Sequence, residues 1–366
     1  MMKMLPDICR IQYGYAFDSA KFTTNNGVPL IRIRDVVRGF SETYTIEECG
    51  QEYIVHTGDI VIGMDGEFNI ARWNGGKAYL NQRVCRLIPT DDVDSMYLFY
   101  FMPKALKAIE DKTPFVTVKH LSAKELNKIV VPLPPIKEQK EISLTLQKTD
   151  ELISLRKQQL SKLDELVKAR FVEMFGEVET NSKGFVMKRM DECCKFIGGA
   201  QPDKSNFEYV KTDDNIRLIQ IRDYKSDRFI TYIPKALARK TCLATDIMIG
   251  RYGPPIFQIL GGIEGAYNVA LMKAVPTKEF HTEYFRYFLK NEKLLRYLEA
   301  FSQRTAGQDG IQIDKLNAYP CFVPPMELQE KFVAFVKKID QSKSEIQKSL
   351  EKLETLKKAL MQKYFG

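Results

Sequence analysis

Short stretches of alternating apolar and polar residues run through residues 1–133, and the same order returns in residues 181–323. The clearest pairs are PLIRIRD at 29–35 with RLIQIRD at 217–223, and GDIVIG at 58–63 with TDIMIG at 245–250. Alternation with a period of two is typical of half-buried strands, and short apolar runs are typical of buried strands. The pattern therefore predicts an α+β fold with two similar strand-rich modules.

Two long stretches carry a different pattern. Residues 136–175 contain neither glycine nor proline and follow a heptad, which residues 326–366 repeat at an offset of 190. Some seam positions are polar in one copy and apolar in the other, such as Arg156 against Ile346. Because each helix is apolar at some seam positions where the other is polar, pairing of the two helices with each other is favoured. We therefore predict an antiparallel pair of long coiled-coil helices between the modules. The alternative, that each helix packs only on its own module, remains open.

The predicted pairing rests on the apolar seam residues. A helix of 40 residues spans about 60 Å, so an antiparallel pair would act as a rod with a module at each end. The seam residues expected to pair are Ile142, Leu146, Ile153, Leu160, Leu163, Val167, Phe332, Val336, Ile339, Ile346, Leu350, Leu353 and Leu360.

Prolines mark where each module gives way to a long helix. PLPP occupies residues 132–135 and VPP occupies residues 323–325. Proline is tolerated in the first turn of a helix but disfavours helix just before it. We therefore predict a first module at 1–133, a first helix at 134–180, a second module at 181–323 and a second helix at 324–366. Gln139 and Gln329 fall in the first turns, where we expect cap chemistry rather than contact with a ligand.

Composition narrows the class of protein. There is no apolar run of 18 residues, so no membrane span is expected, and the first residues lack the apolar stretch of a signal peptide. The seven cysteines form no Cys-x-x-Cys pair and there are only three histidines. We therefore expect neither a disulfide framework nor a metal site, and a cytoplasmic location.

The charge is spread unevenly. The net charge is +8, and residues 181–325 carry 22 basic against 16 acidic side chains, whereas the first module is neutral. A basic module favours a polyanionic partner such as nucleic acid, although a solubilising surface excess would give the same count.

Motifs for catalysis are missing from the sequence. It contains no Gly-rich phosphate loop and no methylation loop of the Asn/Asp-Pro-Pro-Tyr/Phe type. Arg, Asn and Gln, which can contact base edges, instead gather near predicted strand ends and Gly-rich turns. The candidate DNA contacts are Arg32, Asn69, Arg72, Trp73, Gln82, Arg83, Lys119, His120, Arg251, Tyr252, Gln258, Asn268, Arg304 and Gln308. The repeated pairs Arg34–Asp35 and Arg222–Asp223 are more simply explained as structural ion pairs.

The repeat resembles a known family. Two modules that each end in a Leu-Pro-Pro-x-x-Glu-Gln type segment before a long helix resemble the specificity (S) subunit of type I restriction-modification enzymes. PLPPIKEQ at 132–139 matches that segment closely, whereas VPPMELQ at 323–329 has leucine where glutamate is usual.

This resemblance implies a non-catalytic subunit that binds double-stranded DNA. Each module would read half of a bipartite target, while the helix pair sets the spacer and docks two methyltransferase (M) subunits. The chain itself would need no cofactor, because S-adenosylmethionine, ATP and Mg belong to the partners, which include restriction (R) subunits. A structural or regulatory assembly protein that no longer reads DNA is the alternative, and a nuclease or methyltransferase in its own right is a third hypothesis.

Overall fold

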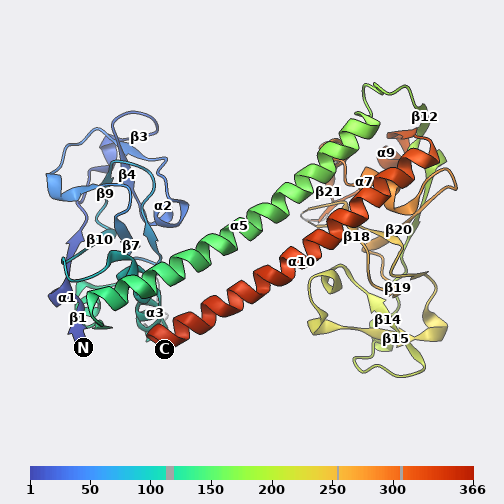
Figure 1. Ribbon diagram of the computed structural model, residues 1–366. Helices are drawn as coiled ribbons and strands as arrows, with labels where there is room; N and C mark the ends of the chain where they lie inside the picture. Colours follow the sequence, from blue (N-terminus) through green and yellow to red (C-terminus); the bar gives the residue numbers. More distant parts are fainter. Residues whose placement is uncertain (113–118, 254, 306–307) are drawn as a thin grey trace. The chain divides into compact units, whose positions relative to one another are not determined.

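The computed structural model describes residues 1–112, 119–253, 255–305 and 308–366, without the side chains of residues 303–309. The chain forms two compact units (Figure 1). Unit 1 comprises Met1–Gln159 and Ile346–Gly366, and unit 2 comprises Leu160–Glu345. Each unit therefore contains one module together with a stretch of both long helices.

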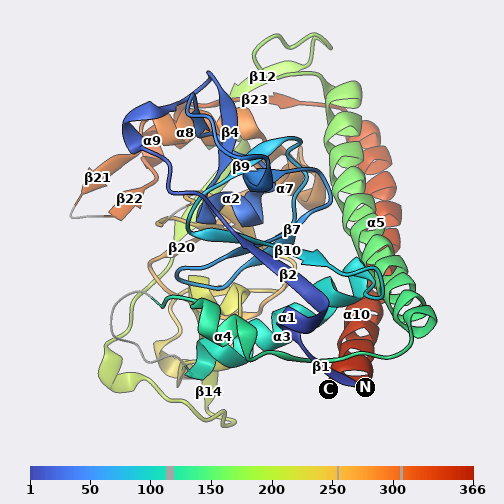
Figure 2. The same cartoon turned by 90° about the vertical axis from the view of Figure 1, so that its left-hand side faces the viewer.

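Unit 1 is built on three sheets (Figure 2). The four-stranded sheet has the order β2 (Cys9–Tyr13), β10 (Val84–Pro89), β7 (Ile60–Gly63) and β8 (Ile70–Arg72). The five-stranded sheet has the order β3 (Phe22–Thr23), β5 (Tyr44–Thr45), β4 (Val28–Ile31), β9 (Ala78–Leu80) and β6 (Ile54–Val55). A two-stranded sheet joins β1 (Met2–Met4) to β11 (Val130–Pro132). All four residues of β7 are buried, as expected because its sequence is a short apolar run, which is typical of a buried strand.

Helices complete the first module. They are α1 (Leu5–Ile8), α2 (Ile33–Arg38), α3 (Ser95–Lys112) and α4 (Ala123–Asn127), with 3-10 turns η1 (Ser19–Lys21) and η2 (Gln51–Tyr53). The large core of this unit joins α1, β7, β10 and α3 with the start of the first long helix and the end of the second.

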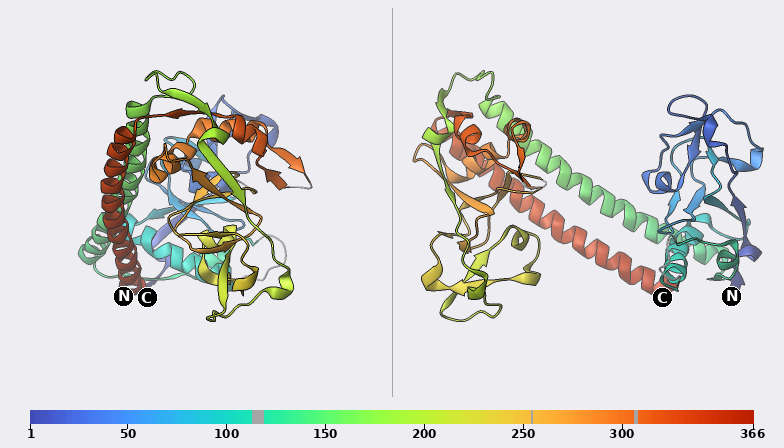
Figure 3. Two further views of the ribbon diagram at one scale, coloured as in Figure 1. Left: turned by 90° about the vertical axis from the view of Figure 1, so that its right-hand side faces the viewer. Right: turned by 180° about the vertical axis from the view of Figure 1, so that it is seen from behind.

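Unit 2 repeats this plan (Figure 3). Its first four-stranded sheet has the order β13 (Cys194–Gly198), β20 (Leu271–Pro276), β17 (Ile247–Gly250) and β18 (Gln258–Leu260). The second has the order β15 (Tyr232–Pro234), β14 (Asn215–Ile219), β19 (Gly265–Tyr267) and β16 (Thr241–Cys242). The pair β12 (Val186–Arg189) and β23 (Pro320–Val323) matches β1 and β11, and β21 (Gln303–Thr305) pairs with β22 (Gln308–Gly310).

The helices of unit 2 follow the same order with one difference. They are α6 (Met190–Cys193), α7 (Thr282–Leu289), α8 (Glu292–Ala300) and α9 (Ile313–Ala318). The short turns are η3 (Lys204–Asn206), η4 (Ile221–Tyr224), η5 (Asp227–Phe229) and η6 (Lys235–Leu237). The second module thus has two helices, α7 and α8, at the position in the chain order that the single helix α3 occupies in the first module. The α+β class with two similar strand-rich modules is confirmed.

The long helices α5 (Ile136–Phe175) and α10 (Met326–Phe365) run antiparallel within each unit. In unit 1, Asp150 pairs with Lys357 at 2.5 Å and Lys157 pairs with Glu354 at 3.2 Å. In unit 2, Asp164 pairs with Lys343 at 2.6 Å. The predicted antiparallel pair is therefore confirmed, and the two seam lysines, 343 and 357, form ion pairs across it.

The thirteen predicted seam residues are all buried or half-buried. The beginnings of the helices also pack on the modules they leave: Ile142 and Leu146 belong to the core of unit 1, and Phe332 and Val336 to that of unit 2. Pairing between the helices and packing on a module, the two alternatives from the sequence, thus both occur, and near the helix ends they involve the same residues.

A buried glutamine fixes the first turn of each long helix. Gln329 accepts a hydrogen bond from His281 N (2.8 Å) and donates to Glu279 O (2.8 Å) and Pro324 O (2.9 Å). Gln139 likewise accepts from the backbone N–H of residue 94 and donates to the carbonyls of residues 92 and 134. These side chains are structural, as expected, but they join helix, proline segment and module rather than cap the helix.

A phenylalanine anchors the last turn of each long helix. Phe175 is fully buried in unit 2, with its ring centroid 4.8 Å from that of Tyr284 and 5.5 Å from that of Phe332. Phe365 is buried in unit 1, 5.3 Å from the ring of Tyr97 and 6.0 Å from that of Phe101. Both ends of each helix are therefore fastened by a buried side chain.

Candidate nucleic-acid interface

A matching backbone frame lies at the end of β7 in unit 1 and of β17 in unit 2. Both strands end in a glycine that packs against an isoleucine side chain. A Cβ added at Gly250 would lie 2.7 Å from Ile221 Cδ1, and one at Gly63 would lie 3.2 Å from Ile33 Cγ2, so a larger residue would crowd the isoleucine in both places. We call the polar residues around this frame the strand rim. It comprises Arg32, Asp65, Asn69, Asn81, Gln82, Arg83 and His120 in unit 1, and Gln220, Arg251, Tyr252, Gln258 and Asn268 in unit 2.

In unit 1 the rim centres on a carboxylate. Asp65 Oδ2 accepts a hydrogen bond from Arg83 Nη1 at 2.7 Å, and Asp65 Oδ1 lies 2.5 Å from His120 Nδ1. The arginine and histidine side chains are about two-thirds exposed, whereas the aspartate is nearly buried. Asp65 therefore holds Arg83 and His120 in place at the surface, and leaves the remaining guanidinium N–H groups of Arg83 for a partner.

In unit 2 the equivalent position carries no acid. Tyr252, at the offset of 187 from Asp65, forms a backbone bridge to Gly310, as Asp65 does to His120. The guanidinium carbon of Arg251 lies 5.3 Å from the ring centroid of Tyr252. One of its nitrogens contacts Val269 O at 3.5 Å, at the outer limit for a hydrogen bond. The same frame thus presents an arginine and an aromatic ring instead of an arginine, an acid and a histidine.

The amide side chains of the rim differ in how much they are used by the fold. Asn268 Oδ1 accepts from Ala270 N at 3.2 Å and so closes a turn, as Asn81 does in unit 1. Asn69 and Gln258 occupy matching places beside the terminal glycines of β7 and β17. Gln82 is exposed next to Arg83. Gln258 Nε2 also donates to Pro255 O at 2.9 Å and Asn69 Nδ2 to Glu67 O at 3.4 Å, so of these amides Gln82 is the most available at the surface.

Arg32 and its counterpart Gln220 each stand at the N-cap of a short helix. The backbone N–H of Arg32 donates to Asp35 Oδ2 at 2.9 Å, and that of Gln220 donates to Asp223 Oδ2 at 3.2 Å. Both carboxylates are buried, and burial raises the pKa of Asp223. The recurring arginine–aspartate pairs are loose contacts, 3.8 Å for residues 34 and 35 and 3.9 Å for residues 222 and 223. The repeated aspartate is mainly a helix cap.

Three candidates use their side chains elsewhere in the fold. Trp73 is 1 % exposed, packs in the core and donates its indole N–H to Gly76 O, so the structure does not support it as a DNA contact. Arg72 sits at the opposite end of β8, where it donates to Gly58 O. Lys119 donates to the carbonyl of Glu110 at the end of α3. The side chains of two unit 2 candidates, Arg304 and Gln308, lie outside the described residues.

Comparison with known proteins shows what the first part of the chain resembles. Residues 1–165 match the family model described as the type I restriction modification DNA specificity domain. This stretch is similar to type I specificity domains. The resemblance to specificity subunits inferred from the repeat and the proline segments is thereby confirmed.

Two relatives that the chain resembles are named as type I specificity subunits. The chain is 35 % identical over 195 residues to the type I restriction enzyme EcoBI specificity subunit of Escherichia coli, covering 51 % of this chain and 41 % of that protein. It is 26 % identical over 148 residues to the MjaVIII specificity subunit of Methanocaldococcus jannaschii, covering 40 % and 35 % respectively. The matches thus span less than half the length of these relatives.

The fold similarity extends along the whole chain. The crystal structure of the type I restriction-modification S subunit from M. genitalium matches with a TM-score of 0.63, covering 100 % of this chain and 96 % of that one. At 15 % identity the likeness concerns the fold alone.

Two kinds of feature are absent from the residues that the structure describes. None of its described helices is long and apolar enough to cross a bilayer. Among the same residues, no cluster of three or more His, Cys, Asp or Glu side chains is arranged to hold a metal ion.

The candidates chosen from the sequence did not include Asp65, the acid at the centre of the unit 1 rim. Asp65 did not stand out because acidic side chains repel phosphates, yet it positions both Arg83 and His120. The signal available in the sequence was its counterpart, Tyr252, a chemically different residue at the same offset as the repeated strand.

Proposed function

We propose that this chain is the DNA-specificity subunit of a type I restriction-modification system and that each module reads half of a bipartite target through its strand rim. The observation that carries the proposal is that both modules contain the same buried backbone frame but expose different side chains around it. Gly63 and Gly250 occupy the same tight place, whereas Asp65, Arg83 and His120 in unit 1 give way to other residues in unit 2. A shared scaffold with divergent surfaces suits two readers of different sequences.

The rim chemistry fits base reading in the major groove. An arginine can present two N–H groups to O6 and N7 of guanine, the commonest specific contact to a base. Arg83 is held by Asp65, so less side-chain entropy is lost when it binds. In unit 2, Arg251 beside Tyr252 offers one such fork without a neighbouring acid, which suits a stronger attraction to phosphates.

The helix pair fits the spacing and docking roles of a specificity subunit. On the unit 1 stretch of α5, Leu144, Leu152 and Leu155 are each 44–51 % exposed, and none of them is a seam residue. Exposed apolar side chains in a row are typical of a protein interface. We propose that two methyltransferase subunits dock on the helix pair and supply the S-adenosylmethionine site, and that ATP and Mg act on restriction subunits. The chain itself contributes recognition and no catalytic group.

Methylome sequencing of cells that carry the whole system tests this proposal. We expect one bipartite motif in which two short specific halves flank a spacer of fixed length. A continuous short motif, or no motif while the partner subunits are active, would contradict it and favour an assembly protein that no longer reads DNA.

A further inference from the structure

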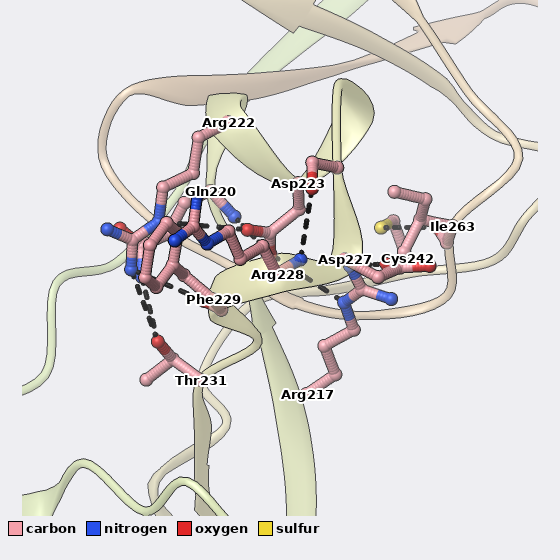
Figure 4. A network of polar contacts seen from close by, with 11 residues as sticks. Arg217, Gln220, Arg222, Asp223, Asp227, Arg228, Phe229, Thr231, Cys242 and Ile263 are labelled. Atoms are coloured by element: carbon pink, nitrogen blue, oxygen red, sulfur yellow. Dashed lines mark hydrogen bonds and ion pairs between the residues drawn. The ribbon is translucent and has the colours of Figure 1, made fainter. Parts of the chain in front are cut away.

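An exposed phenylalanine carrying two arginines stands out in unit 2. Phe229, at the end of η5, is 59 % exposed. The guanidinium carbons of Arg222 and Arg228 lie 5.8 Å and 5.2 Å from its ring centroid. Figure 4 shows both side chains converging on the ring. We call Arg222, Arg228 and Phe229 the arginine platform.

The positive charges of the platform are poorly compensated. Asp227, the nearest exposed acid, is engaged by Arg217 at 2.8 Å. Arg222 is 3.9 Å from the buried Asp223 and makes two long hydrogen bonds, to Phe229 O (3.4 Å) and to Thr231 Oγ1 (3.5 Å). The guanidinium group of Arg228 has no hydrogen bond or ion pair to the residues that the structure describes; only its backbone N–H is bonded, to Ser226 Oγ at 3.1 Å. Two guanidinium groups on one ring repel each other, and a bound anion would relieve that repulsion.

The platform borders an open, polar hollow. It has a volume of about 550 Å³ and is lined by Tyr209, Lys211, Ile230, Tyr232 and the Arg217-paired Asp227 as well as by the platform. Tyr209 is 74 % exposed, so the hollow has low walls and is open to solvent. Such a shape suits a polymer strand that passes across it better than a small ligand, which binds where it can be enclosed.

The first module has a similar arrangement, but its second arginine is paired with an acid. There Arg34 donates to Thr43 Oγ1 at 3.0 Å, as Arg222 does to Thr231 Oγ1, and Phe40 is 52 % exposed nearby in the sequence. However, Arg38 is paired with Glu42 at 2.9 Å. At this place an arginine without an ion pair is therefore found in unit 2, the module with the basic excess, whereas the nearby arginine of unit 1 is paired.

The platform is adjacent to the unit 2 strand rim. Ile221, one residue before Arg222, fills the space over Gly250, and Ile219 O accepts from the backbone N–H of Asn268. A strand of DNA held at Arg251 would thus find the platform on the neighbouring element of the same module.

We propose that the arginine platform binds a backbone phosphate of DNA beside the bases read at the unit 2 rim, and so gives the second module the larger share of non-specific affinity. This inference rests on the proposed function for the identity of the polyanion. It goes further by assigning a contact that adds affinity without adding sequence information.

Salt-dependent DNA binding by the full-length chain tests the platform. The probe is a duplex pool of random sequence, titrated at several salt concentrations with wild type, Arg228→Ala and Arg228→Lys. Each phosphate contact adds about 0.9 to the slope of log K against log salt. We expect Arg228→Ala to lower the slope by about 1 and Arg228→Lys to keep it. The matched control is Arg38→Ala in the first module, which removes an exposed, paired arginine and should leave the slope unchanged.

A slope for Arg228→Ala equal to that of wild type, or an equal loss in Arg38→Ala, would overturn the platform. Sequencing of the bound pool separates this from the proposed function. Wild type and Arg228→Ala should enrich the same bipartite motif. If wild type enriches no motif, sequence reading fails, whereas the slope comparison still decides whether Arg228 contacts phosphate.

Discussion

The buried glutamine in the first turn of α10 offers a sharp test of how a module is fastened to its helix. Gln329 is completely buried and makes three hydrogen bonds, to His281 N, Glu279 O and Pro324 O. Replacing it by methionine keeps the length of the side chain and removes all three. Each buried backbone group left without a partner costs about 1 kcal/mol at the low end of measured values, so the loss is about 3 kcal/mol.

Hydrogen exchange followed by mass spectrometry is the suitable assay, because a chain with two units need not unfold in one step. In Gln329→Met the peptide that contains the amide of His281 should lose protection by roughly 100-fold, which corresponds to about 3 kcal/mol. The control is Gln341→Met, an exposed position on the same helix. Protection within threefold of that control would refute the reasoning that these three bonds hold the joint.

A charge at the same position adds a pH dependence. In Gln329→Glu the carboxylate can still accept from His281 N but would face the carbonyl oxygens of Glu279 and Pro324. Burial against two acceptors raises the pKa of this glutamate in the folded state. The destabilisation should therefore be greatest at neutral pH and shrink as the pH falls and the group is protonated. A deficit that grows toward acid would contradict this.

Other predictions concern the helix ends and the thiols. Phe175→Ala, at a fully buried position, should destabilise unit 2 by about 3–5 kcal/mol, whereas the exposed Val172→Ala should change stability by less than about 0.5 kcal/mol, both measured by urea unfolding; equal effects would contradict the anchor. Of the seven unpaired cysteines only Cys49 is not buried, and burial raises the pKa of Cys85 to about 12. A thiol reagent at pH 8 should therefore label one cysteine rapidly, and Cys49→Ser should remove that label; rapid labelling of several thiols would count against the fold.

The sequence was most informative where a pattern repeats over a long stretch. Heptads at Ile142 and Phe332 extend over 40-residue helices, and their polar interruptions, including Lys343 and Lys357, proved to be sites of pairing with aspartates. The apolar runs GDIVIG and TDIMIG also predicted buried strands correctly, because these strands lie in the interior of their sheets. Periodicity reports which side of an element is buried, and that is what these predictions needed.

Single side chains were harder to place. Trp73 lies in a Gly-rich stretch and looked like a surface residue, yet its ring fills the space where a Cβ on Gly75 would stand, 2.4 Å away. Gln329 looked like a cap but reaches back into the module. Arg228 was not a candidate. Its role is inferred from two structural facts: its guanidinium group has no ion pair in the described residues, and it packs on the Phe229 ring together with Arg222. Such relations depend on contacts between elements, which a local pattern does not contain.

The central claim is that the two modules read their halves of the target separately. Replacing residues 1–133 with the corresponding module of another specificity subunit, followed by methylome sequencing, tests it most directly. The account predicts that one half of the bipartite motif changes while the other half stays the same. A change in both halves, or in neither half while methylation continues, would contradict it.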